Sequence, residues 1–115
     1  MWRGVSSGLA YGWDYRRGSR FKLVEEYSSF EGHKINVKFS SIAQNNEYYE
    51  DNYPISVLSI PDQLSYKYVI SCEGNDKDSG LQWKLKSNSL VFMAEPTISS
   101  WLMEKTLIPN YHYIK

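Results

Sequence analysis

The segment from Tyr66 to Ser89 constrains the fold more than any other part of the 115-residue chain. It opens with an apolar run at 67–72 that is typical of a strand, and a turn-forming Glu-Gly-Asn-Asp sequence follows at 73–76. A helix-like segment extends over 79–87, and a second apolar run covers 90–93. A strand, a helix and a further strand in this order predict a βαβ unit, and therefore a parallel sheet with helices packed on its faces.

The glycine-containing turn of this unit also predicts a site for an anion. The first amides of a helix have no partner within the helix, and the helix dipole favours negative charge there. Gly74 permits a close approach of the backbone, and Asn75, Asp76 and Ser79 carry side chains that can form hydrogen bonds. The local pattern fits two interpretations equally well: a seat for the phosphates of a nucleotide, or a connection whose polar residues only cap the helix.

The same turn contains an Asp-x-Asp sequence at 76–78, a pattern that can hold a divalent metal against a diphosphate. Hard cations require more oxygen ligands than this segment offers, so a solvated turn is the better interpretation, and we expect neither a metal nor another cofactor. Because two carboxylates repel phosphate, Lys77 or an arginine folded nearby must offset their charge.

Arginines cluster beside glycines near the N-terminus, and the planar guanidinium group suits phosphate oxygens. The alternative, which sequence alone favours, is a surface loop with scattered charges. The cluster consists of Arg3, in the sequence Trp-Arg-Gly that ends at Gly4, together with Arg16, Arg17 and Arg20.

The composition limits the partners, the number of domains and the location that can be expected for this chain. Lys and Arg total 13, as do Asp and Glu, so the net charge of zero gives no long-range attraction to nucleic acid or to an acidic membrane. Hydrophobic residues make up 42% of the chain, which is enough for the core of a single domain over 1–115. No window approaches the roughly 18 apolar residues of a membrane span, so we expect no transmembrane segment and a location that is cytoplasmic or peripheral to a membrane.

The rest of the chain also predicts alternating strands and helices. Residues 2–18 read as a loop after a short initial strand, 44–53 as a surface loop, and 55–60 as either a strand or a buried loop. Residues 35–39 alternate as a half-buried strand. The remaining expectations are a helix that Ser19 caps and that carries Phe21, Leu23, Val24 and Tyr27, a helix that Thr97 caps with Ile98, Trp101 and Leu102 on one face, and a final strand over 111–115.

Several side chains allow both a functional and a structural interpretation. Trp83 points away from the leucines of its expected helix, so it either packs against a second element, which is favoured, or lines a cleft. Cys72 is expected to fill a small buried apolar position, with nucleophilic chemistry as the minor interpretation. His112 could act as a general base, but a lone histidine in such a position is more often structural. Lys84 and Lys86 are expected to be solvated.

Taken in order, these motifs resemble the C-terminal half of glycosyltransferase family 90, which includes lipopolysaccharide-modifying, capsule-associated and protein O-glucosyltransferase-like members. The resemblance extends over nearly the whole chain and is closest to bacterial-type members with a Gly-Asn-Asp turn. The order and spacing of the pieces together make it specific. The matching pieces are Trp2-Arg3-Gly4, Ser19-Arg20 with Leu23-Val24, Tyr66-Lys67-Tyr68, Glu73-Gly74-Asn75-Asp76, Ser79-Gly80-Leu81 with Trp83 and Leu85, Ser87-Asn88-Ser89, Ser100-Trp101-Leu102-Met103-Glu104 and His112-Tyr113.

The resemblance implies an α/β fold, namely the Rossmann-like, three-layer half of a GT-B-type glycosyltransferase with a mainly parallel sheet. It implies that this half binds the nucleotide-sugar donor, a UDP-sugar, for transfer to a carbohydrate or other glycoconjugate acceptor. In the family, the arginine of the Trp-Arg-Gly motif contacts the donor diphosphate, and the loop after the Lys-Tyr strand also contacts the donor. The donor-binding residues that follow are Arg3, Gly4, Arg20, Gly74, Asn75, Asp76, Ser79 and Gly80.

Two departures from the family pattern affect what can be expected. Animal members have an arginine at the position of Gly80, so donor binding here must rely on Arg3, Arg20 or a lysine. The family's catalytic aspartate lies upstream of the Trp-Arg-Gly motif, so we expect a catalytically incomplete, donor-binding fragment without a catalytic residue. The alternative from another class is a non-catalytic nucleotide- or glycan-binding module derived from the same fold. A nucleic-acid binder is a third interpretation, which the zero net charge disfavours.

Overall fold

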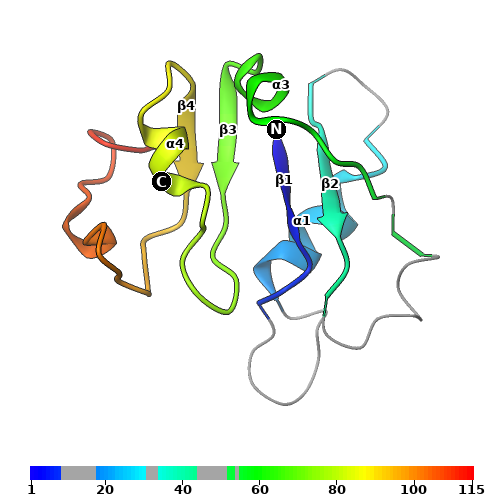
Figure 1. Ribbon diagram of the computed structural model, residues 1–115, viewed down its shortest axis with the longest axis horizontal. Helices are drawn as coiled ribbons and strands as arrows, with labels where there is room; N and C mark the ends of the chain where they lie inside the picture. Colours follow the sequence, from blue (N-terminus) through cyan, green and yellow to red (C-terminus); the bar gives the residue numbers. More distant parts are fainter. Residues whose placement is uncertain (9–17, 31–33, 44–51, 54) are drawn as a thin grey trace.

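The computed structural model describes residues 1–8, 18–30, 34–43, 52–53 and 55–115. Within these ranges the chain is mixed α/β with two pairs of short parallel strands (Figure 1). The parallel pairing predicted from the βαβ pattern is confirmed. β1 (Trp2–Val5) pairs with β2 (Val37–Ser41), and β3 (Tyr68–Ser71) pairs with β4 (Leu90–Met93).

Met1 joins the two strand pairs side by side. Its amino group donates a hydrogen bond to the carbonyl of Tyr68, and its carbonyl accepts one from the amide of Ile70, each at 2.9 Å. These bonds place β3 next to β1, so the strands follow the order β2-β1-β3-β4 across the molecule (Figure 1). The chain order therefore reverses between β1 and β3. In open α/β sheets, ligands bind beyond the carboxyl ends of the strands at such a reversal.

The last residues of the chain form a short segment that pairs with β4. The amide of Ile114 donates to the carbonyl of Val91 at 2.8 Å, and the carbonyl of Ile114 accepts from the amide of Met93 at 3.0 Å. Ile114 also forms a parallel bridge with Phe92. The final strand predicted over 111–115 is thus present as a short bridged segment.

Two helices cover opposite faces of the strands: α1 (Ser19–Tyr27) and α4 (Leu81–Leu85). Neighbouring residues of a strand point to opposite faces. Val69 belongs to the core beneath α4, whereas Ile70 packs against the core beneath α1. The α1 core contains Trp2, Phe21, Val24, Val37 and Phe39, and the α4 core contains Met1, Val69, Leu81, Val91, Met93 and Tyr113.

Several predicted elements agree closely with the structure. β4 coincides with the predicted strand at 90–93, β3 and α4 lie within the predicted 67–72 and 79–87, and the initial strand is β1. α1 forms where the helix was predicted, but Gly18 is its N-cap and Ser19 is its first helical residue, so the predicted Ser19 cap is wrong. Most of the predicted surface loop at 44–53 lies outside the described residues.

A short helix beside the amino end of β1, α3 (Ile60–Leu64), was not predicted (Figure 1). The hydroxyl oxygen of Ser59 accepts a hydrogen bond from the Asp62 amide at 3.2 Å, and Pro61 lies in the first turn, where a missing N–H costs nothing. The Ser-Ile-Pro-Asp sequence carries this helix-start signal, which the interpretation of 55–60 as a strand or buried loop overlooked.

The helix predicted from Thr97 is wrong. Residues 97–103 are not helical, and only a single 3₁₀ turn follows, η2 (Glu104–Thr106). The Glu73 carboxylate accepts hydrogen bonds from the amide and hydroxyl of Thr97, at 3.0 and 2.6 Å. The Glu104 carboxylate accepts from the amide and hydroxyl of Ser100, both at 2.6 Å. The backbone amides of Thr97 and Ser100 therefore bind carboxylates, one of them 24 residues away in the sequence, and do not form the helical hydrogen bonds that the local pattern suggested.

Candidate functional site

A cavity of about 420 Å³ lies over the face of β1 that is opposite α1. It extends from α3 to the loop between β3 and α4. The eight residues predicted to bind the donor all line this cavity, although they come from three separate parts of the chain. They are Arg3, Gly4, Arg20, Gly74, Asn75, Asp76, Ser79 and Gly80. Arg16 and Arg17, the other members of the arginine cluster, lie outside the described residues.

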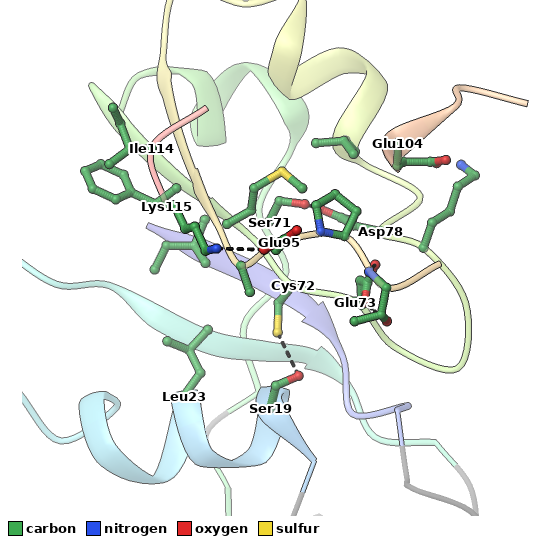
Figure 2. A pocket seen from close by; sticks show the side chains of 18 residues that line it. Ser19, Leu23, Ser71, Cys72, Glu73, Asp78, Glu95, Glu104, Ile114 and Lys115 are labelled. Carbon is green, nitrogen blue, oxygen red and sulfur yellow. Dashed lines mark hydrogen bonds and ion pairs between the residues drawn. The ribbon is translucent and has the colours of Figure 1, made fainter. Parts of the chain in front are cut away.

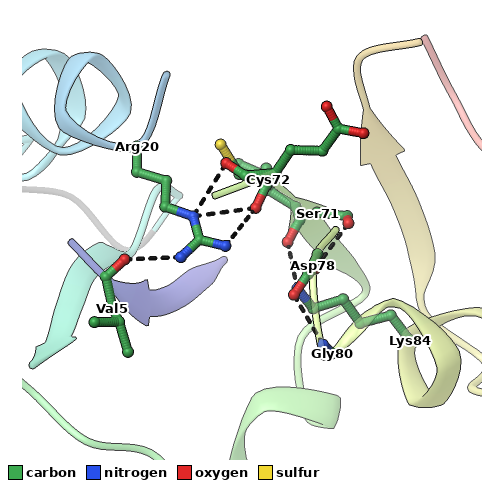
Figure 3. A network of polar contacts seen from close by, with 9 residues as sticks. Val5, Arg20, Ser71, Cys72, Asp78, Gly80 and Lys84 are labelled. Carbon is green, nitrogen blue, oxygen red and sulfur yellow. Dashed lines mark hydrogen bonds and ion pairs between the residues drawn. The ribbon is translucent and has the colours of Figure 1, made fainter. Parts of the chain in front are cut away.

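Arg20 binds the carboxyl ends of β1 and β3 together (Figure 3). Its Nη1 donates to the carbonyl of Val5 at 2.9 Å and to the hydroxyl of Ser7 at 3.0 Å. Its Nη2 donates to the carbonyl of Cys72 at 2.9 Å, and its Nε is shared between the carbonyls of Cys72 and Glu73, each at 3.2 Å. The side chain is buried, and no carboxylate among the described residues forms an ion pair with it. Its positive charge is therefore solvated by backbone dipoles, and within the described ranges no carboxylate neutralises it.

Gly74 and Gly8 complete the contact between the two strand ends. A Cβ on Gly74 would lie 2.7 Å from the Arg20 guanidinium carbon, so only glycine lets the loop rest on that group. Gly8 has a φ of +111°, and a Cβ there would lie 2.9 Å from Gly74 Cα. The Gly8 amide also donates to Asn75 Oδ1 at 3.0 Å. The loops after β1 and β3 thus touch through backbone, which fixes the carboxyl end of the cavity.

Asp78 occupies the amides at the start of α4 (Figure 3). Its Oδ1 accepts from the Gly80 amide at 2.8 Å, and its Oδ2 accepts from the Ser71 hydroxyl at 2.7 Å and from the Lys84 ammonium. The Lys84 ammonium also donates to the Ile70 carbonyl at 3.0 Å. The amides of Gly80 and Leu81 are therefore both bonded to Asp78, and the N-cap residue, Gly80, provides no side-chain cap. The Lys84 side chain is only 4% exposed, so the expectation that it is solvated is wrong.

Arg3 reaches from β1 toward the start of β2. Its Nη1 donates to the carbonyls of Trp2 and Asn36, at 2.9 and 3.3 Å, and its Nη2 donates to Asn36 Oδ1 at 2.7 Å. The buried Nε has no hydrogen-bond partner among the described residues. Burial lowers the pKa of the guanidinium, and the nearby Tyr66 hydroxyl partly offsets this effect. Arg3 thus stays charged in a partly desolvated place, where a nearby anion would gain more than in water.

The other predicted residues contribute polar groups or space. Asn75, Asp76 and Ser79 are exposed at the mouth of the cavity. Gly4 leaves room for the ring of Trp2, because a Cβ there would lie 2.5 Å from a ring carbon. A Cβ on Gly80 would lie 3.1 Å from the indole nitrogen of Trp83, so the tryptophan ring occupies the space that a side chain at 80 would need.

The charges around the cavity favour an anion. Among the described residues, four cationic side chains and two carboxylates line it, which gives this lining a formal charge of +2 in a chain whose net charge is zero. Asp78 offsets the charge of Lys84, and Asp76 offsets that of Lys77. The excess positive charge therefore equals that of the two arginines. The four cations are Arg3, Arg20, Lys77 and Lys84, and the carboxylates are Asp76 and Asp78.

The sequence did not predict that three further side chains lie together in this site. Asp78 and Lys84 form the buried pair that shapes the cavity wall, and their separation of six residues spans a turn, where no helical periodicity predicts a contact. Gln63 lines the cavity from α3, the helix that was not predicted. Only the Ser-Ile-Pro-Asp start of α3 could have indicated it.

A second cavity, of about 560 Å³, lies on the α1 side of β3 and β4 (Figure 2). Its walls are largely apolar, with Leu23, Cys72 and Ile114 among them, and the Lys115–Glu95 ion pair at 2.7 Å lies at its rim. It contains none of the predicted donor-binding residues. The charge and the predicted residues both favour the smaller cavity as the candidate site.

Two side chains with a possible chemical role have structural surroundings. The Cys72 thiol donates to the Ser19 hydroxyl at 3.3 Å, and burial raises the pKa of this thiol, which disfavours the reactive thiolate. His112 Nδ1 accepts a hydrogen bond from the Ile108 amide at 2.8 Å and so closes a turn. Neither residue lines the candidate site.

No metal-binding cluster of His, Cys, Asp or Glu occurs in the part of the chain that the structure describes. Both carboxylates of the Asp-x-Asp sequence are engaged: Asp76 Oδ1 accepts from the Lys77 amide at 2.7 Å, and Asp78 binds Ser71, Gly80 and Lys84. In the same ranges, none of the helices has the length and apolar character needed to cross a bilayer.

Comparison with known proteins supports a glycosyltransferase in general. A 58-residue stretch is 41% identical to an O-glucosyltransferase LpsA of Dichelobacter nodosus. The matched stretch makes up 50% of this chain and 18% of that relative, so the match covers less than a fifth of the relative's length. No family model and no solved structure matches the chain.

Proposed function

We propose that this chain forms the donor-binding part of a family-90-like glycosyltransferase, with a Rossmann-like half-domain of the GT-B type. The 420 Å³ cavity would hold a nucleotide-sugar, with a UDP-sugar as the expected donor. The acceptor would be a glycan, a lipopolysaccharide or a protein. The similarity to an O-glucosyltransferase supports the class of enzyme, and the cavity supports the donor-binding role.

The single observation that carries this proposal is the charge of Arg20 at the carboxyl ends of β1 and β3, which no carboxylate in the described part of the chain pairs with. The strand order reverses between these two strands, which is the place where doubly wound sheets bind nucleotides. A desolvated cation that lacks a carboxylate favours a ligand with negative charge. A diphosphate at this position would gain from Arg20, whereas Arg3 lines the same cavity nearer the start of β2.

The same arrangement fits the charge that develops during sugar transfer. When the anomeric carbon is displaced, the nucleoside diphosphate leaves with negative charge, and fixed donors near that charge stabilise the transition state. Arg3 would supply a positive charge in a partly desolvated place, and Arg20 would supply a charge held in place by carbonyls. The loop at 74–76 rests directly on Arg20, so a ligand that contacts this loop lies close to the arginine.

Calorimetric titration with UDP and UDP-glucose tests the proposal. We expect the chain to bind both, and we expect Arg3→Gln to weaken binding about tenfold, because a hydrogen bond to a charged group contributes about 1.5–3 kcal/mol. Lys115→Gln is the matched control, since it removes a cation at the rim of the other cavity. Absence of binding at millimolar UDP would refute the donor-site assignment, and so would an equal effect of the two substitutions.

The second candidate function is a non-catalytic binding module, which would use the same cavity. Both candidates predict nucleotide binding, and only the transferase predicts release of the sugar. Transfer or hydrolysis of UDP-glucose by the full-length protein, abolished by Arg3→Gln, would favour the transferase. Tight UDP binding without any sugar release by that protein would favour the binding module.

A further inference from the structure

We infer that Trp83, Gln63 and Ile60 form a nucleobase subsite at the α3 side of the candidate cavity, an inference that rests on the proposed donor-binding function. All three residues line this cavity, together with both arginines. They provide an aromatic ring, a side-chain amide and an apolar surface, which are the groups that recognise a base. They carry no charge of their own, and Arg20 lies at the opposite, carboxyl end of β1.

Trp83 is placed to stack and is not packed in a core. It belongs to neither hydrophobic cluster of the described chain, although its neighbours Leu81 and Leu85 belong to or pack against the α4 core. Its ring lies beside the Lys84 ammonium, which is 5.4 Å from a ring centroid. The indole N–H has no hydrogen bond among the described residues, so the ring edge also has a donor available. Of the two interpretations of Trp83, the cavity therefore favours the cleft-lining one.

Gln63 is a buried amide with unused hydrogen-bonding capacity. The residue is 8% exposed, and its Nε2 donates to the Leu58 carbonyl at 3.0 Å, which fixes the orientation of the amide. The Oε1 accepts no hydrogen bond in the described structure and is not sealed from solvent. A buried polar atom without a partner is costly unless a ligand or water satisfies it. An amide of this kind matches the donor and acceptor edge of a base.

Ile60 provides an apolar wall on the other helix of the cavity. Its side chain is 46% exposed at the start of α3, where an unpartnered isoleucine gains from contact with a ring. α3 lies beside the amino end of β1, and the 74–76 loop lies beyond the carboxyl ends of the strands (Figure 1). Ile60 and Gln63 are thus separated from Arg20 along the length of β1, and Trp83 lines the same cavity from α4. A base followed by a diphosphate has the same order of chemical groups.

Titration of UDP and of inorganic pyrophosphate against the same variants tests this subsite, because pyrophosphate has the charge of UDP without the base. We expect Trp83→Ala to weaken UDP binding about tenfold, the size of a lost base–aromatic stack, and to change pyrophosphate binding less than about twofold. Trp83→Phe should retain most of the UDP affinity, since it keeps an aromatic face. Gln63→Met, which keeps the side-chain volume, should bring the affinities for UDP and ADP closer together.

The outcomes separate this subsite from the donor-binding function itself. If UDP binds and Trp83→Ala leaves its affinity unchanged, or weakens UDP and pyrophosphate equally, the subsite is refuted and the anion site stands. If wild-type protein binds pyrophosphate as tightly as UDP, the subsite is also refuted. If the wild-type protein binds neither ligand, the proposed function fails first, and the subsite fails with it. Selective loss of UDP binding together with the Phe rescue supports the subsite.

Discussion

The buried pair of Asp78 and Lys84 makes the wall of the candidate site depend on two charges at once. The side chains are 12% and 4% exposed, and removing one partner leaves the other charge buried without compensation. We expect Asp78→Asn and Lys84→Met each to lower the free energy of unfolding by about 3–5 kcal/mol. The double variant should recover most of this loss, because no unpaired charge remains. Urea unfolding of the four proteins measures the coupling, and additive losses would contradict it.

Gly74 shows how a residue without a side chain can control a charged one. A Cβ at this position would lie 2.7–2.9 Å from three atoms of the Arg20 guanidinium, which several hydrogen bonds hold in place. We expect Gly74→Ala to cost about 1–3 kcal/mol of stability through overpacking and to weaken UDP binding by displacing the loop.

Gly80→Ala is the matched comparison for Gly74→Ala, because its nearest neighbours would lie at 3.1 Å or more and include flexible side chains. It should have the smaller effect in thermal unfolding and in calorimetric titration. A larger loss at Gly80 than at Gly74 would show that the contact with Arg20 is unimportant.

At the level of elements, local sequence was sufficient where a segment's own residues satisfy its backbone. β4 follows from four consecutive apolar residues, and α1 and α4 follow from apolar residues spaced along one face. Local sequence failed at 97–106, where the spacing of Ile98, Trp101 and Leu102 suggested a helix. Trp101 is 67% exposed, and the backbone there binds the carboxylates of Glu73 and Glu104. The contact with Glu73 spans 24 residues, which no helical pattern can report.

Glu104 should make the stability of this segment depend on pH. Burial alone would raise the pKa of its carboxyl group, but the hydrogen bonds from Ser100 outweigh burial and hold the pKa below the ordinary value of 4.5. A group whose pKa is lowered by folding stabilises the folded state above its unfolded pKa, and this stability is lost as the pH falls below about 4.5. Thermal unfolding between pH 3 and pH 7 should therefore show a smaller acid loss for Glu104→Gln than for the wild type. Parallel pH profiles would contradict this assignment.

At the scale of the whole molecule, the candidate site depends on contacts that only the fold creates. The eight residues implied by the family resemblance lie together in one cavity, although nothing in their local sequence places Arg20 against Cys72, 52 residues away. Strand order accounts for this: β3 returns to the side of β1 that β2 does not occupy. The sequence predicted where most strands and helices lie along the chain. The order of the strands, and the cavity that results from it, depend on long-range pairing.

The distribution of charge predicts how salt affects nucleotide binding. Because the net charge of the chain is zero, attraction of UDP depends on local charge, which is +2 for the described residues that line the cavity. Mobile ions screen exposed charges beyond a Debye length of about 10 Å at 0.1 M salt, and they screen buried charges much less. We expect the UDP affinity to fall only several-fold between 0.05 and 0.5 M NaCl, and Arg3→Gln should make this dependence shallower. Calorimetric titration over that salt range measures both slopes. A slope that is identical in the variant would show that Arg3 does not face the phosphates, because removing a charge that contacts the ligand must reduce the electrostatic part of the binding free energy.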